Sequence, residues 1–309
     1  MSTSTDHTLG PWNRYWFTPK SAGALGIARI YFFAAMSIML WEHNVGLWAD
    51  MTQVVWWPIP LFRNLGLSQV SPDNAALLHF AFKLCLIFSC LGFLTRISTA
   101  SCTLMALYIV GLPNCYGGKI GHGYTLPLIL MGIFAFSDSG AAWSIDNLIR
   151  KKFARDPKPA ASGRYNWPMK LMLVTFALVF FGAGYSKLYR SGLEWIFSDN
   201  FSNLLLMHQY DRPVPLDWGV WIAKQNWLCV LMALMAVVFE LGAPLGLINN
   251  YLKAFIFGSL LLMQIGIWLL IGVKFTPYFF CYPLLLPWQR VSDFLESLDF
   301  SWLDGKEAR

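Results

Sequence analysis

Lys187 is the residue whose type and position most clearly permit chemistry. It lies at the end of an apolar run, Leu171 to Leu188 (LMLVTFALVFFGAGYSKL), where a charge is costly. An ionisable group at the edge of a membrane segment indicates a functional site, because hydrocarbon resists charge without a partner or water. Desolvation also disfavours the ammonium form, so Lys187 is a candidate base near neutral pH. On position alone, a snorkelling anchor at the headgroups is the commoner role.

Four further ionisable side chains fall inside apolar runs, namely Arg29, His79, Lys83 and Glu240. His79 and Lys83 are four residues apart, so they share one helix face. Glu240 lies deep in its run. A buried salt bridge from Glu240 to Arg29 or Lys83 and a functional role are equally good interpretations. With Trp195, the residues His79, Lys83 and Glu240 are the candidates for binding a cofactor.

His122 lies in a glycine-rich turn, YGGKIGHGY, on the same predicted side as Lys187. A histidine there could orient or polarise a substrate, because its charge changes near physiological pH. The alternative is a hydrogen-bonded loop histidine. The six cysteines lack metal-ligand spacing, so no metal site is predicted. A disulfide between Cys115 and Cys229 is one alternative use of two of them.

The composition requires a membrane around these residues. The chain has 309 residues, 56% hydrophobic and 13% charged, with a mean hydropathy of +0.48. Soluble domains carry roughly 25% charged residues. Runs of about 20 apolar residues cross a bilayer. We therefore predict an all-α polytopic membrane protein with eight spans: Ala22–Trp41, Asn74–Leu94, Thr99–Cys115, Tyr124–Trp143, Met169–Leu188, Trp227–Ile248, Leu252–Gly272 and Phe275–Trp288.

Basic residues fix the predicted orientation. The loop from Ile149 to Tyr165 contains six of them, opposed only by Asp156. By the positive-inside rule this loop is cytoplasmic, and an even number of spans makes both termini cytoplasmic. Lys187 is then at the extracytoplasmic end of its helix. The placement of the charge also accounts for the net charge of +6 without a nucleic-acid partner.

The spans define a simple domain organisation. Residues 1–21 are predicted as a cytoplasmic N-terminal segment, 22–288 as the transmembrane domain and 289–309 as a cytoplasmic tail. The two long outer loops, His43–Asp73 and Tyr189–Asn226, are rich in tryptophan, which prefers the headgroup layer. We expect both loops to form interfacial helices that together cover a cavity opening outward.

Four motifs carry a resemblance to a known family. The segment AGYSKL, which contains Lys187, resembles the A-G-x-x-K-L segment of vitamin K-dependent γ-glutamyl carboxylase. Three others are similar to L-G-x-x-x-R-I-S, H-x-Y and W-S-[IV]-D segments: Cys90–Ser98, His122–Tyr124 and Trp143–Asp146. They occur in family order across most of the chain. The sequence is identified as a member of the HTTM (horizontally transferred transmembrane) domain family.

The resemblance implies a chemistry for these positions. In the carboxylase, the motif lysine deprotonates vitamin K hydroquinone, whose anion reacts with O2 to give an epoxide and a strong base. That base removes a glutamate γ-proton, and CO2 traps the carbanion. By motif position Lys187 would be the base and His122 a pocket residue near the quinol. Arg96, Trp143 and Asp146 would be structural positions on the cytoplasmic side. The implied cofactor is a reduced quinone of the vitamin K or menaquinone type.

The sequence also departs from the carboxylase. The stretch Leu261–Gly266 has no histidine where the carboxylase has one in its seventh helix. We also expect the chain to lack the large lumenal domain that binds peptide substrates, so a complete peptide carboxylase is not implied.

Two function classes follow. The first is a quinol-dependent membrane enzyme, a carboxylase-like lyase or an oxidoreductase, in the plasma membrane or a bacterial inner membrane. The alternative is a non-enzymatic membrane module that binds a partner protein, peptide or lipid, for example in secreted-peptide maturation. Transport past His79, Lys83 and Glu240 is a third class, but the sequence shows no inverted repeat.

Overall fold

The computed structural model describes residues 10–43, 45–116, 123–153, 159–210, 216–273 and 275–298. Over these ranges the regular structure is helical, and the β-type pairing is an isolated bridge between Lys20 and Ser162. The all-α polytopic class is therefore confirmed. Six helical stretches are long and apolar enough to cross a membrane: Ala22–Leu40, Pro72–Leu91, Thr95–Cys115, Gly163–Ser191, Asn226–Leu247 and Asn250–Ile271.

Two of the eight predicted spans are not full-length helices. In place of Tyr124–Trp143 the structure has α7, Thr125–Phe136, because the turn-forming sequence SDSG follows it. Its 12 residues extend about 18 Å, less than the roughly 30 Å hydrocarbon core. In place of Phe275–Trp288 it has α15, Thr276–Phe279, and the 3₁₀ helix η5, Tyr282–Leu285. Three prolines interrupt that segment and prevent a continuous helix.

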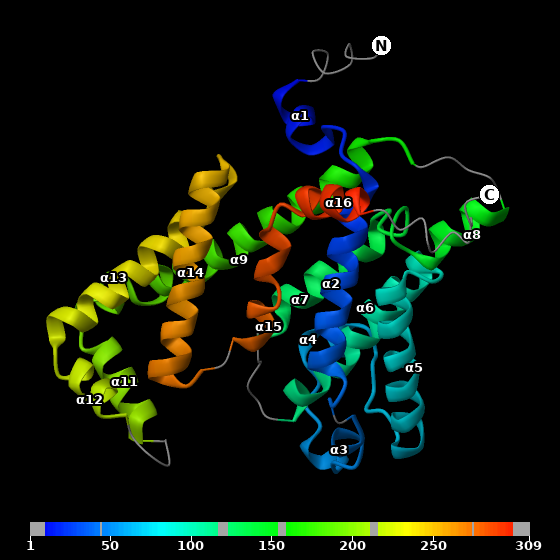
Figure 1. Cartoon of the computed structure of the whole chain (residues 1–309). Coiled ribbons are helices and arrows are strands. Elements are labelled where there is room, and N and C mark those ends of the chain that lie inside the picture. Colours follow the sequence, from blue (N-terminus) through cyan, green and yellow to red (C-terminus); the bar gives the residue numbers. More distant parts are fainter. Residues whose placement is uncertain are drawn as a thin grey trace. The chain divides into compact units, whose positions relative to one another are not determined.

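The chain forms two compact units, residues 1–172 with 283–309, and residues 173–282. The elements of unit 1 are α1 Pro11–Phe17, α2 Ala22–Leu40, α3 Val45–Ala49, η1 Gln53–Val55, α4 Pro60–Asn64, α5 Pro72–Leu91, α6 Thr95–Gly111, η2 Leu112–Cys115, α7, α8 Ile145–Phe153, η3 Gly163–Tyr165, the start of α9 and α16 Trp288–Ser297. Within this unit α2 packs against α5 and α16, and α6 packs between α5 and α7 (Figure 1). The stacked rings of Phe32 and Phe134 join α2 to α7.

Unit 2 contains most of α9 Asn166–Ser191, then α10 Glu194–Phe197, α11 Asn200–Tyr210, α12 Asp217–Ala223, α13 Asn226–Gly242, η4 Ala243–Leu247, α14 Asn250–Ile271 and α15. Helices α13 and α14 lie side by side (Figure 1). A core of buried apolar residues links α10 to α14: Ile196, Phe201, Leu205, Ala223, Cys229, Ala233, Val237, Leu270 and Ile271. The second tryptophan-rich loop is thus helical, as predicted, and it contributes to the core of this unit.

All six cysteines are free thiols. The predicted alternative of a disulfide between Cys115 and Cys229 is therefore wrong. Both side chains are buried, and each thiol donates to a carbonyl nearby in the chain, Gly111 for Cys115 and Ile222 for Cys229. They act as small apolar core residues with a weak local hydrogen bond.

Candidate functional site

Lys187 and Glu240 form an ion pair between two helices of unit 2. Lys187 is near the end of α9 and Glu240 is near the end of α13. The Lys187 Nζ lies 2.7 Å from Oε1 and 2.6 Å from Oε2 of Glu240. The Glu240 side chain is only 7% exposed and that of Lys187 is 25% exposed. The ammonium is therefore held by a carboxylate and does not act as a snorkelling anchor.

A glycine permits this pairing. Gly184 precedes the lysine by three residues, so both lie on one face of α9. A Cβ added at Gly184 would lie 2.9 Å from the Glu240 Cβ and 3.1 Å from the backbone nitrogen of Leu241. Only a residue without a side chain allows α9 and α13 to approach this closely. At Gly182, on the other side of α9, an added Cβ would have no neighbour within 4 Å.

Both residues of the pair lie within candidate spans, Lys187 four positions before the end of Gly163–Ser191 and Glu240 seven positions before the end of Asn226–Leu247. Glu240 is fourteen positions after Asn226, the first residue of α13, which places it about 21 Å along that helix at 1.5 Å per residue. The apolar span continues to Leu247. An ion pair at this position is largely shielded from water, and it is tolerated because the two charges cancel and hydrogen-bond each other.

Trp195 completes the environment of the lysine. Its ring centroid is 5.3 Å from the Lys187 Nζ, within the range of a cation–π contact. Trp195 and Leu188 both pack against the buried core of unit 2. Of the four predicted cofactor-binding candidates, the structure thus brings Glu240 and Trp195 to Lys187.

The other two candidates, His79 and Lys83, contact Trp41 within unit 1. The His79 Nε2 is 3.1 Å from the Trp41 carbonyl oxygen, and the Lys83 Nζ is 4.7 Å from the centroid of its ring. Lys83 therefore makes a cation–π contact with Trp41. The predicted salt bridge between Glu240 and Arg29 or Lys83 is wrong in its partner, because Glu240 pairs with Lys187.

Arg29 is enclosed by backbone carbonyl groups. Its side chain is fully buried, and its guanidinium donates to the carbonyls of Ser139 at 2.8 Å and Trp143 at 2.6 Å, with a longer contact to Cys90. An added Cβ at Gly92, where φ is +69°, would lie 2.5 Å from Arg29 Nη1. These contacts join α2 to the ends of α5 and α7, so Arg29 has a structural role.

His43 was not singled out by the sequence and has an unusual environment. Its ring lies 6.2 Å from that of Tyr124 in an edge-to-face arrangement. Burial, with a smaller effect from the charge of His79, lowers the pKa of the His43 imidazole below its ordinary value. His122 lies outside the described residues, so its proposed role stays a prediction.

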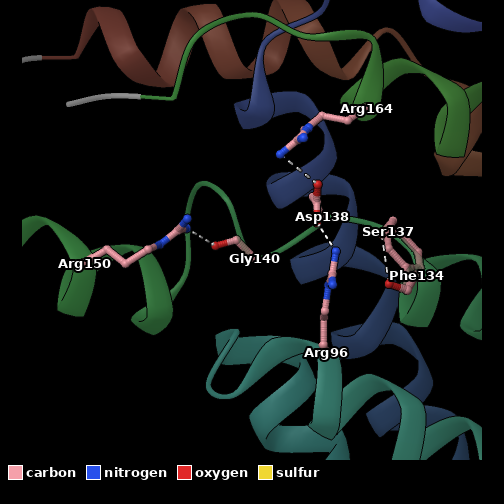
Figure 2. A network of polar contacts seen from close by, with 7 residues as sticks. All are labelled: Arg96, Phe134, Ser137, Asp138, Gly140, Arg150 and Arg164. Carbon is pink, nitrogen blue, oxygen red and sulfur yellow. Dashed lines mark hydrogen bonds and ion pairs between the residues drawn. The ribbon is translucent and has the colours of Figure 1, made fainter. Parts of the chain in front are cut away.

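A second polar cluster lies in unit 1, at the ends of α6 and α7. Asp138 lies between Arg96 and Arg164 (Figure 2). Its Oδ1 is 2.5 Å from Arg96 Nη2, and its Oδ2 is 3.5 Å from Arg164 Nη1. Arg150 of α8 donates to the Gly140 carbonyl oxygen at 2.9 Å. These residues border a cavity of about 560 Å³.

A family model described as the HTTM domain matches residues 17–288. The chain belongs to the HTTM family. Neither the curated proteins nor the solved structures contain a match to the chain. The family fixes the kind of membrane domain, whereas the activity must be argued from the site.

Two HTTM motifs meet in one structural arrangement. Asp146, from the WSID segment, accepts hydrogen bonds from the backbone N–H groups of Leu94 and Thr95 at 2.8 and 2.7 Å, and from the Thr95 hydroxyl at 2.6 Å. Its carboxylate therefore caps the first turn of α6, where backbone donors and the helix dipole favour an anion. Trp143 turns the chain at φ +51°. Asp146 and Trp143 thus shape the backbone around the start of α6.

Two buried polar atoms of the HTTM domain were missed from the sequence. The Gln264 Oε1 on α14 and the Tyr282 hydroxyl lack a hydrogen-bond partner among the described residues. Gln264 lies in the stretch Leu261–Gly266, where the carboxylase has a histidine. That difference was the sequence signal that could have pointed to Gln264. Within the same described ranges, three or more His, Cys, Asp or Glu side chains are nowhere grouped as metal ligands would be.

Proposed function

We propose that this HTTM protein is a membrane enzyme in which Lys187 acts as a base toward a lipid-soluble quinol or a peptide, and Glu240 controls the protonation of that base. The observation that supports it most is the ion pair, with Nζ–Oε distances of 2.7 and 2.6 Å inside an apolar span. A charge in that position is costly and is usually retained for function.

The pair offers a direct route to a free amine. As an ammonium, Lys187 has no lone pair and cannot accept a proton. If one proton moves across the hydrogen bond to the Glu240 carboxylate, an amine and a carboxylic acid result. Two neutral groups suit a low-dielectric site better than two charges do, so burial lowers the cost of this transfer. The Lys187 Nζ can then accept a proton from a substrate, and Glu240 must release its own proton before the next cycle.

We propose a reduced quinone of the vitamin K or menaquinone type as the cofactor of this site. Such a ring would supply an acidic hydroxyl and an oxidisable, O2-reactive centre. Trp195 offers an aromatic face next to Lys187. Trp195 would orient the ring beside Lys187, which would take the proton.

The proposal includes a location. We place the protein in the plasma membrane or a bacterial inner membrane, with the basic segment that includes α8 and Arg164 in the cytoplasm. Three basic residues in the last turn of α8 support this orientation by the positive-inside rule. If α7 and the segment of α15 and η5 also cross the membrane, both termini would be cytoplasmic.

The test separates catalysis from stability by using three variants. We would reconstitute Lys187→Met, the double variant Lys187→Met/Glu240→Met, and Lys224→Met as a control, since Lys224 is an exposed lysine of the same unit. Oxidation of a reduced menaquinone analogue in oxygenated proteoliposomes would be followed by absorbance. Both Lys187 variants should lose more than a hundredfold in rate, consistent with loss of an essential general base, and the control should be unaffected.

The double variant decides the question. It replaces both charges by apolar groups of similar volume, so it should fold even if the single variant does not. A folded double variant that oxidises the quinol at the normal rate would remove Lys187 from the mechanism.

A second candidate function is a membrane module that binds a partner through its tryptophan-rich loops. Exposed indoles support it, with Trp57 at 74% and Trp221 at 58%. In that case Lys187→Met would leave binding unchanged, whereas Trp57→Ala and Trp221→Ala would each weaken the association of a cross-linked partner.

A further inference from the structure

The cavity in unit 1 is bordered by three arginines from three segments of the chain. Arg96 comes from the first turn of α6, Arg150 from α8 and Arg164 from η3. We propose that this arginine pocket, of about 560 Å³, binds the phosphate of an anionic phospholipid. The proposal is independent of the chemistry at Lys187.

The guanidinium groups are held in place but remain accessible. Asp138 lies between Arg96 and Arg164, whose side chains are 72% and 63% exposed (Figure 2). Arg150 is fixed by the Gly140 carbonyl. Each guanidinium has five N–H donors in a planar fork, and each of these contacts engages one nitrogen. Further donors can therefore bind phosphate oxygens, often two at a time.

The charges in the pocket favour an anion. Its lining contains three arginines and two acids, Asp138 and Asp146, which leaves a net charge of +1. Asp146 already accepts three hydrogen bonds at the start of α6. Asp138 is the remaining carboxylate, and it contacts two of the three guanidinium groups, those of Arg96 and Arg164.

Apolar side chains at the same place identify a lipid as the occupant. Leu94, Ile97 and Ile149 line the pocket and are 52%, 64% and 43% exposed. The pocket adjoins the start of α6, one of the candidate spans, where headgroups and acyl chains meet. On α8, Phe153 is 76% exposed beside the basic residues, a pattern typical of helices that lie in the membrane interface. Arginines for the phosphate and exposed aliphatic groups for the first acyl carbons match a phospholipid better than a free anion.

The expected cytoplasmic orientation agrees with this occupant. Anionic lipids give the cytoplasmic leaflet its negative surface potential, and each Lys or Arg near that surface contributes about 1 kcal/mol, equivalent to roughly a fivefold change in affinity. Basic pockets between helices on that side bind phosphate headgroups.

The experiment measures lipid affinity on the full-length protein. Purified protein in detergent micelles would be titrated with phosphatidylglycerol, and the bound lipid would be counted by native mass spectrometry. Arg150→Gln and Arg164→Gln should each weaken binding about fivefold. Lys151→Gln is the matched control, because it removes the same charge from α8 without lining the pocket, and it should change affinity less than twofold.

A conservative variant guards against misfolding. Arg164→Lys keeps the charge near Asp138 but loses the planar fork, so it should weaken binding about twofold while the melting temperature is unchanged. If instead Arg150→Gln and Lys151→Gln weaken binding equally, the attraction is diffuse and the pocket is refuted.

Two further comparisons test the occupant. Phosphatidylcholine, which has no net charge, should bind at least fivefold more weakly than phosphatidylglycerol, and equal binding would overturn the proposal. Inorganic phosphate at millimolar concentration should displace little lipid. If it competes as well as a short-chain phosphatidylglycerol, the site takes a free anion and the lipid assignment is wrong.

Discussion

Lys187→Met should strongly destabilise unit 2, because it leaves the Glu240 carboxylate without its ammonium partner. Removal of one partner from a buried ion pair costs about 3–5 kcal/mol. We expect a value near the lower end, about 3 kcal/mol. The reason is that the Lys187 side chain is 25% exposed, and an isolated Glu240 can take up a proton and become neutral.

The double variant gives the reasoning its sharpest test. Methionine at both positions removes both charges and fills a similar volume, and such replacements range from neutral to stabilising. With Glu240→Met also costing about 3 kcal/mol, additivity would predict a loss of about 6 kcal/mol for the double variant. We expect it to lie within about 1 kcal/mol of the natural protein, which gives a coupling energy of about 5 kcal/mol.

Unfolding by sodium dodecyl sulfate in mixed micelles, followed by tryptophan fluorescence, would provide the four free energies of this cycle. Gly184 and Trp195 are unchanged in every variant, so the cycle reports the ion pair. If Lys187→Met costs less than 1 kcal/mol, or if the two single effects simply add, the 2.6 Å contact does not exist in the membrane and the argument for a paired base fails.

Three further predictions concern glycines and a histidine. Gly184→Ala should cost about 1–3 kcal/mol by forcing two helices apart, whereas Gly182→Ala, whose added Cβ meets nothing within 4 Å, should be neutral or stabilising by up to about 1 kcal/mol; thermal melting compares the two. Gly92→Ala and Gly66→Ala both place a Cβ on a residue with positive φ, which is strained. Only Gly92→Ala also brings that Cβ within 2.5 Å of the buried Arg29 guanidinium, so the melting temperature of this variant should fall further than that of Gly66→Ala. Because the pKa of His43 is lowered on folding, the unfolded state binds more protons below about pH 6.5, and stability should fall as the pH drops below that value. His43→Asn should flatten this profile between pH 7.5 and 5.5, and a profile as steep as that of the natural protein would refute the assignment.

The sequence alone determined the helical membrane class, because the length and apolarity of a span are local properties. It placed five of the six full-length spans within a few residues of their ends and marked the segment Ile149–Tyr165 as basic. It overestimated the lengths of the helices at α7 and α15. The SDSG turn and three prolines end these helices even though the average hydropathy of both segments is high. The motif positions also came from the sequence.

The partners of the charged residues were decided by the tertiary structure. Lys187 and Glu240 are 53 residues apart, and nothing in either segment states that they meet. Arg29 looked equally suitable as the partner of Glu240, but its guanidinium donates to carbonyl groups as far as 114 residues away in the sequence. Which charge meets which depends on how closely two helices approach, and at α9 and α13 one glycine without a Cβ sets that distance. Packing between distant segments therefore decides which partner neutralises a buried charge. The hydropathy of a segment cannot predict that partner.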